Sequence, residues 1–182
     1  MSNQNLVDIA LKEVGVREVP INSNRGPRVE EFQKYVGAWL VGSAWCAAFV
    51  AWVFGQAYPG SNPAGKQSSA VMGFWTRNAS REDFVRFLPA DVKSGKYKIE
   101  PGDLFVLCSD PALVDQVRVG RVKAHTGHCG VCEGNMLSAT KFGTIEGNTN
   151  EAGSREGGGV YHRSRSLDEA KLVGFVRYLG KK

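Results

Sequence analysis

The sequence lacks any apolar run approaching the ~18 residues that a membrane-spanning helix requires. It has only four cysteines in 182 residues, too few for a disulfide-dense secreted domain of this size. The N-terminal segment shows no basic stretch followed by a continuous apolar run, so no signal peptide is expected. Disorder is also excluded, because 42% of the residues are hydrophobic and 23% are charged. We therefore expect a globular protein that is made in a reducing cytoplasm.

Length and charge narrow the class of protein further. A chain of 182 residues fits one domain at ~150 residues per domain, and it can bury a core without disulfides or a structural metal. Lysine and arginine number 23 against 18 aspartates and glutamates, which gives a net charge of +5. This excess favours an anionic partner such as nucleic acid, a membrane surface or a cell wall, without choosing among them.

Apolar periodicity differs between the two halves of the chain. Helical spacing predicts helices at residues 4–14 and 27–36 and from residue 46, with shorter helical pieces at 68–77 and 80–87. Apolar runs between glycine-rich turns predict strands at residues 102–108, 128–133, 141–146, 160–165 and 172–179. Helices followed by a run of strands indicate an α+β fold with a mainly antiparallel sheet.

Cys46 is a candidate nucleophile because of its expected place in the third helix. With Ser43 as the N-cap, Cys46 would lie in the first turn, where free backbone N–H groups and the helix dipole favour a thiolate. Phe49, Val50 and Val53 share its face, so the thiol should point toward the body of the fold. The same position also suits a small core residue, and helix position alone does not choose between the two.

Four short segments follow one another along the chain in an order that is typical of a known family: residues 45–52 (WCAAFVAW), 101–104 (PGDL), 127–131 (GHCGV) and 144–148 (TIEGN). In this the chain resembles the CHAP family (cysteine, histidine-dependent amidohydrolases/peptidases), a papain-like group common in bacteriophage lysins and bacterial wall hydrolases. Gly15 to Glu18 (Gly-x-x-Glu) and residues 24–27 (NRGP) extend the resemblance toward the N-terminus. It implies that residues 1–182 form a single CHAP-like catalytic domain with a papain-like fold.

The resemblance also implies the roles of individual residues. Cys46 would be the nucleophile and His128 its general base, Glu146 would orient the imidazole, and Asn148 would be its companion or substitute. Glu146 and Asn148 would point to one face of a strand that continued through both. The implied reaction is hydrolysis of a peptidoglycan amide through a thioester, at the N-acetylmuramoyl-L-alanine bond or within the stem or cross-bridge peptide. It needs no metal and no organic cofactor.

Four further residues are candidates for binding substrate. Aromatic side chains near the cysteine could line a groove for sugar or peptide, and a basic side chain could hold a stem-peptide carboxylate; the candidates are Trp45, Trp75, Tyr35 and Arg25. Each of them also fits a plain core or surface position. The functional interpretation is favoured for Trp45, because it directly precedes Cys46.

A metal site is the rival interpretation of residues 125–132, which contain His125, His128, Cys129 and Cys132. On a strand, however, Cys129 and Cys132 point to opposite faces because they are three positions apart. His125 and His128 have the same spacing and would also point to opposite faces. Cys108, Cys129 and Cys132 are then expected to be buried small hydrophobes. His125 stays open as an alternative general base or as a substrate contact.

The expected partner is bacterial peptidoglycan, together with an immunity protein or delivery machinery, and with neither nucleic acid nor membrane insertion. A protein made in the bacterial cytoplasm without a signal peptide would act in the periplasm or cell wall after release as a phage lysin or injection as an antibacterial effector. Two alternatives remain: a non-catalytic wall-binding or phage structural module of the same fold, and a papain-like protease that acts on protein.

Overall fold

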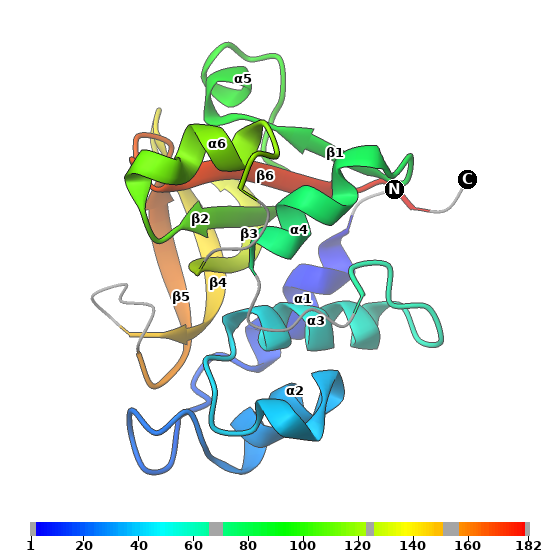
Figure 1. Ribbon diagram of the computed structural model, residues 1–182, viewed down its shortest axis with the longest axis vertical. Helices are drawn as coiled ribbons and strands as arrows, with labels where there is room; N and C mark the ends of the chain where they lie inside the picture. The colour runs from blue at the N-terminus through cyan, green and yellow to red at the C-terminus, as the bar shows by residue number, and fades with distance from the viewer. Residues whose placement is uncertain (1–2, 66–70, 123–125, 151–156, 181–182) are drawn as a thin grey trace.

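The computed structural model describes residues 3–65, 71–122, 126–150 and 157–180. Its centre is a six-stranded sheet in the order β1-β6-β2-β3-β4-β5, in which every neighbouring pair is antiparallel (Figure 1). The strands are β1 (Phe84–Phe87), β2 (Leu104–Cys108), β3 (Gly127–Met136), β4 (Lys141–Thr149), β5 (Gly159–Ser166) and β6 (Leu172–Tyr178). With the helices below, this confirms the α+β prediction.

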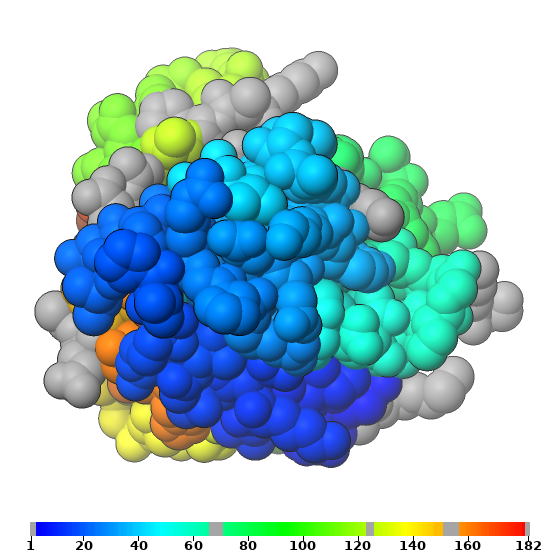
Figure 2. Space-filling model, turned by 90° about the horizontal axis from the view of Figure 1, so that it is seen from below, coloured from blue at the N-terminus to red at the C-terminus, as the bar shows by residue number. Residues whose placement is uncertain are grey.

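Three longer helices come from the first third of the chain: α1 (Gln4–Lys12), α2 (Pro27–Val36) and α3 (Cys46–Ala57). They lie together at one end of the molecule in Figure 1, and the first third of the chain covers the face seen from below in Figure 2. The shorter helices are α4 (Met72–Thr76), α5 (Pro89–Lys93) and α6 (Val114–Arg118), with 3₁₀ turns η1 (Ala38–Leu40), η2 (Arg77–Ser80) and η3 (Pro111–Leu113). Helices α4 and α6 both pack on β6.

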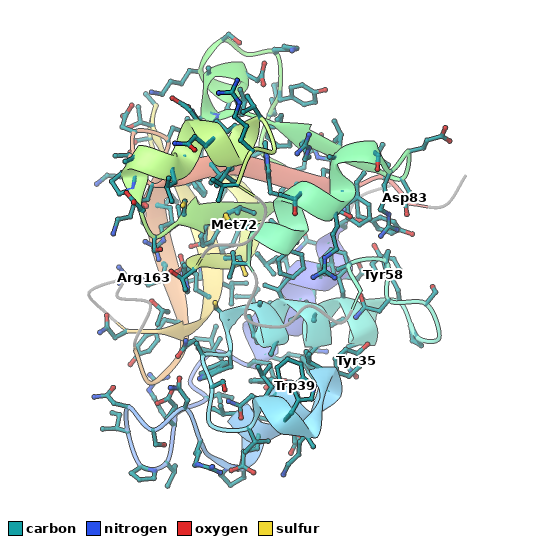
Figure 3. The ribbon with its side chains drawn as sticks, in the orientation of Figure 1. Tyr35, Trp39, Tyr58, Met72, Asp83 and Arg163 are labelled. Atoms are coloured by element: carbon teal, nitrogen blue, oxygen red, sulfur yellow. The ribbon has the colours of Figure 1, made fainter. Side chains whose placement is uncertain are left out.

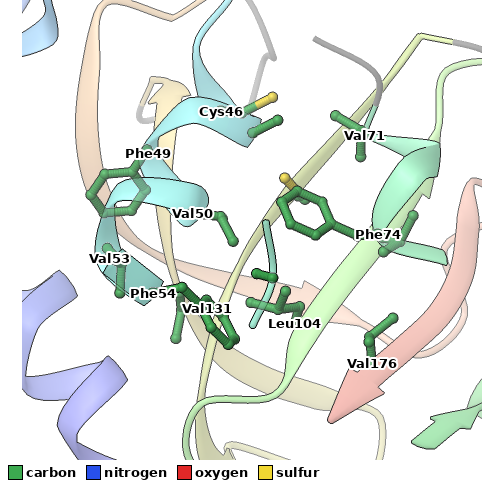
Figure 4. Close-up of a cluster of buried hydrophobic side chains, with 14 of the residues drawn as sticks. Cys46, Phe49, Val50, Val53, Phe54, Val71, Phe74, Leu104, Val131 and Val176 are labelled. Atoms are coloured by element: carbon green, nitrogen blue, oxygen red, sulfur yellow. The ribbon is translucent and has the colours of Figure 1, made fainter. Parts of the chain in front are cut away.

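Helix α3 is buried on most of its circumference. Eight of its 12 residues are buried, because α2 covers one side and strands β3 and β4 cover another. A helix that is apolar nearly all round is what such a position requires. Cys46 lies at the tip of this helix, with Phe49 and Val50 farther along it (Figure 4). The prediction that the Cys46 face points into the body of the fold is confirmed.

The two faces of the sheet carry separate apolar clusters. Val106, Cys129 and Val131 pack with α3 and its neighbours, whereas Phe105 and Cys132 pack with aromatic residues on the opposite face. Strand alternation therefore separates Cys129 from Cys132, as the sequence predicts. Among the described helices, none has the length and apolar character needed to cross a membrane.

Two local predictions are wrong, and a third is confirmed over the residues that the structure describes. Residues 84–87 form β1 rather than helix, since they pair with β6 along its free edge. Of the helical piece expected at 68–77, residues 72–76 are helical as predicted, and residues 68–70 lie outside the described part of the chain. Ser43 does not cap α3: Trp45 occupies the N-cap position without a side-chain cap, and the Ser43 carbonyl accepts a hydrogen bond from Gln33 (2.8 Å).

Candidate active site

Cys46 is the first residue of α3, so its thiol lies where the helix has unsatisfied backbone N–H groups. Glu18, which lies outside α3, holds the start of this helix in place through hydrogen bonds. One of its carboxylate oxygens accepts from the Trp45 indole N–H (2.8 Å) and the other from the Asn24 backbone N–H (3.0 Å). Trp45 in turn stacks on Phe32, with 5.8 Å between ring centroids. The Gly-x-x-Glu motif thus anchors the residue that precedes the nucleophile candidate.

His128 lies near the start of β3 and is almost fully buried. Its Nε2 atom is 2.7 Å from Glu146 Oε2. Its Nδ1 atom is buried and has no conventional hydrogen bond within the described residues. Because Glu146 occupies Nε2, Nδ1 is the nitrogen left for Cys46, and the two groups shift each other's pKa. The structure therefore brings Cys46, His128 and Glu146 into one row.

The Glu146 carboxylate is satisfied on every side. Oε1 accepts from Thr144 Oγ1 (2.6 Å) and from Arg165 Nε (2.8 Å), while Oε2 accepts from His128 and from Arg165 Nη2 (2.5 Å). Burial acts to raise the pKa of Glu146, but the hydrogen bonds and charges of Arg165 and His128 lower it to about 2. Glu146 is consequently an anion at neutral pH, and it accepts a hydrogen bond from His128 Nε2–H.

Gly130 makes room for this contact. A Cβ atom at position 130 would lie 2.8 Å from the Phe105 ring and 2.9 Å from Glu146 Cγ, closer than real Cβ atoms approach. Only a residue without a side chain lets Glu146 lie between β3 and Arg165. This gives a physical reason for the second glycine of the GHCG segment, two residues after His128.

The electrostatics of the row favour a thiolate–imidazolium pair. Hydrogen bonds from the Cys129 thiol, and then those of His128 with its charge, outweigh burial and lower the pKa of Cys46 well below its usual value. Burial acts to lower the pKa of His128, but Cys46 and Glu146 raise it to about 9. Burial and the neighbouring Cys46 raise the pKa of Cys129, which stays a neutral thiol and donates to Cys46. A Cys46 anion beside a His128 cation is the state that nucleophilic chemistry needs.

Asn148 does not share the role of Glu146 in this structure. Strand β4 does continue through Asn148, but its register shifts between Glu146 and Thr149, and Asn148 has a left-handed backbone (φ 58°). The strand continues as the prediction required, but its regular alternation is interrupted between these two residues. Asn148 is buried, and its Oδ1 atom has no hydrogen-bond partner within the described segments. The hydrogen bond that orients the imidazole comes from Glu146.

Two of the expected substrate-binding aromatics are core residues. Trp45 is completely buried between Phe32 and Glu18, so it anchors the helix and presents no surface to a ligand. Trp75 is 3% exposed, and its indole N–H points to the Arg118 carbonyl at 3.4 Å. The substrate-binding prediction is wrong for Trp45, because its adjacency to Cys46 in the sequence does not reveal which way its ring points. For Trp75 the core alternative holds.

Tyr35 and Arg25 lie apart from the row. The Tyr35 hydroxyl accepts from Asn62 Nδ2 (3.0 Å) and lies over Gly55 of α3. Figure 3 shows Tyr35 beside Trp39, well separated from Met72, whose side chain reaches Gly127 at the start of β3. Arg25 is exposed and pairs with Glu30 at 3.7 Å. The structure does not place either residue at the candidate site.

Arg165, Thr144 and Cys129 are site residues that the sequence analysis did not select. Thr144 could have been selected from the sequence, since it precedes Glu146 by two positions on one strand and so shares its face. Arg165 depends on the pairing of β4 with β5, which no local pattern specifies. His125, the alternative base, lies outside the described residues. Among the described residues, no cluster of three or more His, Cys, Asp or Glu side chains is arranged to hold a metal ion.

Comparison with known proteins gives no match for this chain, whether among protein-family models, curated proteins or solved structures.

Proposed function

We propose that this protein is a cysteine-dependent hydrolase, papain-like in architecture, that cleaves an amide bond of bacterial peptidoglycan. The observation that carries the proposal is the row in which Cys46, at a helix tip, adjoins a buried His128 whose other ring nitrogen is held by Glu146. The CHAP-like segments supply the substrate class.

The chemistry follows from the charges of the row. The Cys46 thiolate attacks the amide carbonyl carbon, and backbone N–H groups at the start of α3 stabilise the oxyanion that forms. His128 gives its proton to the leaving amine, which departs and leaves a thioester on Cys46. Neutral His128 then takes a proton from water, and the resulting hydroxide releases the product as a carboxylic acid and restores the thiolate. Glu146 keeps the ring aligned through both proton transfers.

Two kinds of bond are candidates: the N-acetylmuramoyl-L-alanine amide, and a peptide bond of the stem or cross-bridge. The net charge of +5 suits an anionic wall polymer. Action in the periplasm or wall requires delivery, either as a phage lysin or as an injected effector, and an injected effector would need an immunity protein in the producing cell.

The test is digestion of purified sacculi, with released muropeptides identified by mass spectrometry. We expect release by the wild type, none by Cys46→Ala or His128→Ala, and normal release by Cys132→Ala, a control that changes a buried cysteine on the other face of the sheet. The masses of the new ends identify the bond. Equal release by Cys46→Ala and wild type would refute the proposal.

The same assay separates the alternatives. A non-catalytic wall-binding module would sediment with sacculi and release nothing. A protease acting on protein would leave sacculi intact but cleave a denatured protein substrate, with that cleavage lost in Cys46→Ala.

A further inference from the structure

A cleft of about 530 Å³ lies beside α4, η2, β1 and α6, on elements that contribute no residue to the Cys46–His128–Glu146 row. Its described lining includes three arginines, Arg77, Arg86 and Arg118, and no acidic residue. Its volume falls in the ~300–1,000 Å³ range of small-molecule sites. Three guanidinium groups therefore share one concave surface, and no carboxylate is part of its described lining.

Arg86 is held with its charge uncompensated. Its guanidinium lies 4.6 Å from the centroid of the Trp75 ring, and Nη1 donates to the Trp75 carbonyl (3.1 Å). Within the described chain it makes no ion pair, and burial alone lowers its pKa. A half-buried cation that uses one N–H donor among the described residues gains from an anion that enters the cleft.

Arg118 forms a second fixed wall. Its Nε and Nη2 atoms donate to the carbonyls of Val173 (2.9 Å) and Leu172 (2.8 Å) on β6. Its Nη1 atom donates to Asp115 Oδ1 (2.8 Å) in an ion pair at the surface, where the Asp115 side chain is 89% exposed to solvent. The guanidinium therefore keeps its position and contributes positive potential to the cleft.

Trp75 joins these two arginines into one rigid unit. The ring supports Arg86, and the indole N–H points to the Arg118 carbonyl. The packing of α4 against α6 fixes the distance between the two sides. Arg77 is exposed at the start of η2 and adds a third guanidinium group at the rim. Such preorganised donors bind a ligand without the cost of ordering them first.

We propose that this arginine cleft binds the phosphate or carboxylate group of a larger anionic ligand. Guanidinium groups pair with both oxyanions through parallel N–H donors. In a bacterial wall the two sources are the phosphodiesters of anionic wall polymers and the free carboxylates of stem peptides. The anion site rests on the cleft and does not require hydrolysis at Cys46, whereas these two sources rest on the proposed action on the wall.

The experiment is a titration of ¹⁵N-labelled full-length protein with glycerol phosphate and, separately, with glutarate at constant ionic strength. We expect saturable shifts of the Thr76 and Gly120 amides, which line the cleft. Tighter binding of glycerol phosphate assigns the site to wall-polymer phosphates, and tighter binding of glutarate assigns it to stem carboxylates. No saturable shift with either probe would overturn the proposal.

Substitutions locate the binding. Arg86→Gln should weaken it by about tenfold or more, since a charge-assisted hydrogen bond is lost. Arg77→Gln, at the exposed rim, should weaken it about twofold to fivefold without affecting folding. Arg17→Gln is the matched control: Arg17 also lies over an aromatic ring, Tyr161 (4.1 Å), but outside the cleft. Affinity of Arg77→Gln equal to that of the wild type would refute the assignment, whether or not Arg86→Gln folds.

Discussion

At the scale of single residues, the reactivity of Cys46 depends on groups that sequence adjacency does not reveal. The thiol is buried, and burial by itself would keep it protonated. Cys129 and His128 reverse that effect, and His128 is in turn charged because Glu146 is an anion held by Arg165. The candidate nucleophile is therefore the first of four charged groups in contact, followed by the His128 imidazolium, the Glu146 carboxylate and the Arg165 guanidinium.

Arg165 should act as a positioning residue for catalysis. Arg165→Met removes two hydrogen bonds from Glu146 and leaves that carboxylate buried with less support, so we expect kcat to fall by at least tenfold at unchanged KM. Stability should fall by about 3–5 kcal/mol, the usual cost of breaking a buried pair. Kinetics with a soluble muropeptide and urea unfolding measure the two effects.

Arg177→Met is the matched control for that prediction. Arg177 makes an equivalent two-point contact with buried Asp103, at 2.8 Å for both bonds, away from His128. It should lose stability and keep kcat. If Arg165→Met keeps kcat as well, Arg165 serves the fold alone.

At the scale of elements, the site depends on how closely α3 approaches β4. Gly147 permits that approach, since a Cβ atom there would lie 2.7 Å from the Trp45 ring and 2.8 Å from Phe49. Helix α3 carries the thiol and β4 carries Glu146, so the Gly147 contact sets the distance between the two ends of the row.

Gly147→Ala should therefore push α3 away from the sheet. We expect a loss of about 1–3 kcal/mol of stability from overpacking and a loss of kcat larger than the loss of folded protein. Gly158→Ala is the comparison, because its Cβ meets chiefly the exposed side chain of Ile21. Thermal unfolding and turnover of both variants decide the matter, and wild-type turnover in Gly147→Ala would contradict the proposed role of this contact.

Elements with strong periodicity were predictable from the sequence, and those fixed by tertiary pairing were not. The apolar stripe of α2 and the runs of β2 and β6 specify their type locally. Strand β1 is only four residues long and depends on the edge of β6. For the same reason His128 and Glu146 could be selected from their motifs, whereas Arg165 needed the register of β4 and β5.

At the scale of the whole molecule, the buried carboxylate of Glu146 ties stability to pH. Its pKa falls from 4.5 in the unfolded chain to about 2 in the fold, so its contribution is complete above pH 4.5 and is lost as the pH falls toward 2. A shift of this size corresponds to up to about 3 kcal/mol.

Urea unfolding between pH 5 and pH 2.5 tests this linkage. The free energy of unfolding of the wild type should drop steeply over that range. Glu146→Gln should be less stable at pH 5, because Arg165 loses its anion, but its stability should vary less with pH. Parallel curves for the two proteins would show that Glu146 is not held ionised by its neighbours.

Cys46 is a thiolate because the Cys129 thiol donates a hydrogen bond to it and because His128 is a cation beside it. The most direct measurement is the rate of iodoacetamide alkylation of each cysteine against pH, in the wild type and in His128→Ala, with sites assigned by peptide mass mapping. We expect selective alkylation of Cys46 below pH 7 in the wild type, and in His128→Ala a Cys46 that reacts only at distinctly higher pH, because the neighbouring cation is lost. Equal alkylation of all four cysteines, or the same Cys46 rate at pH 6 in both proteins, would contradict this expectation.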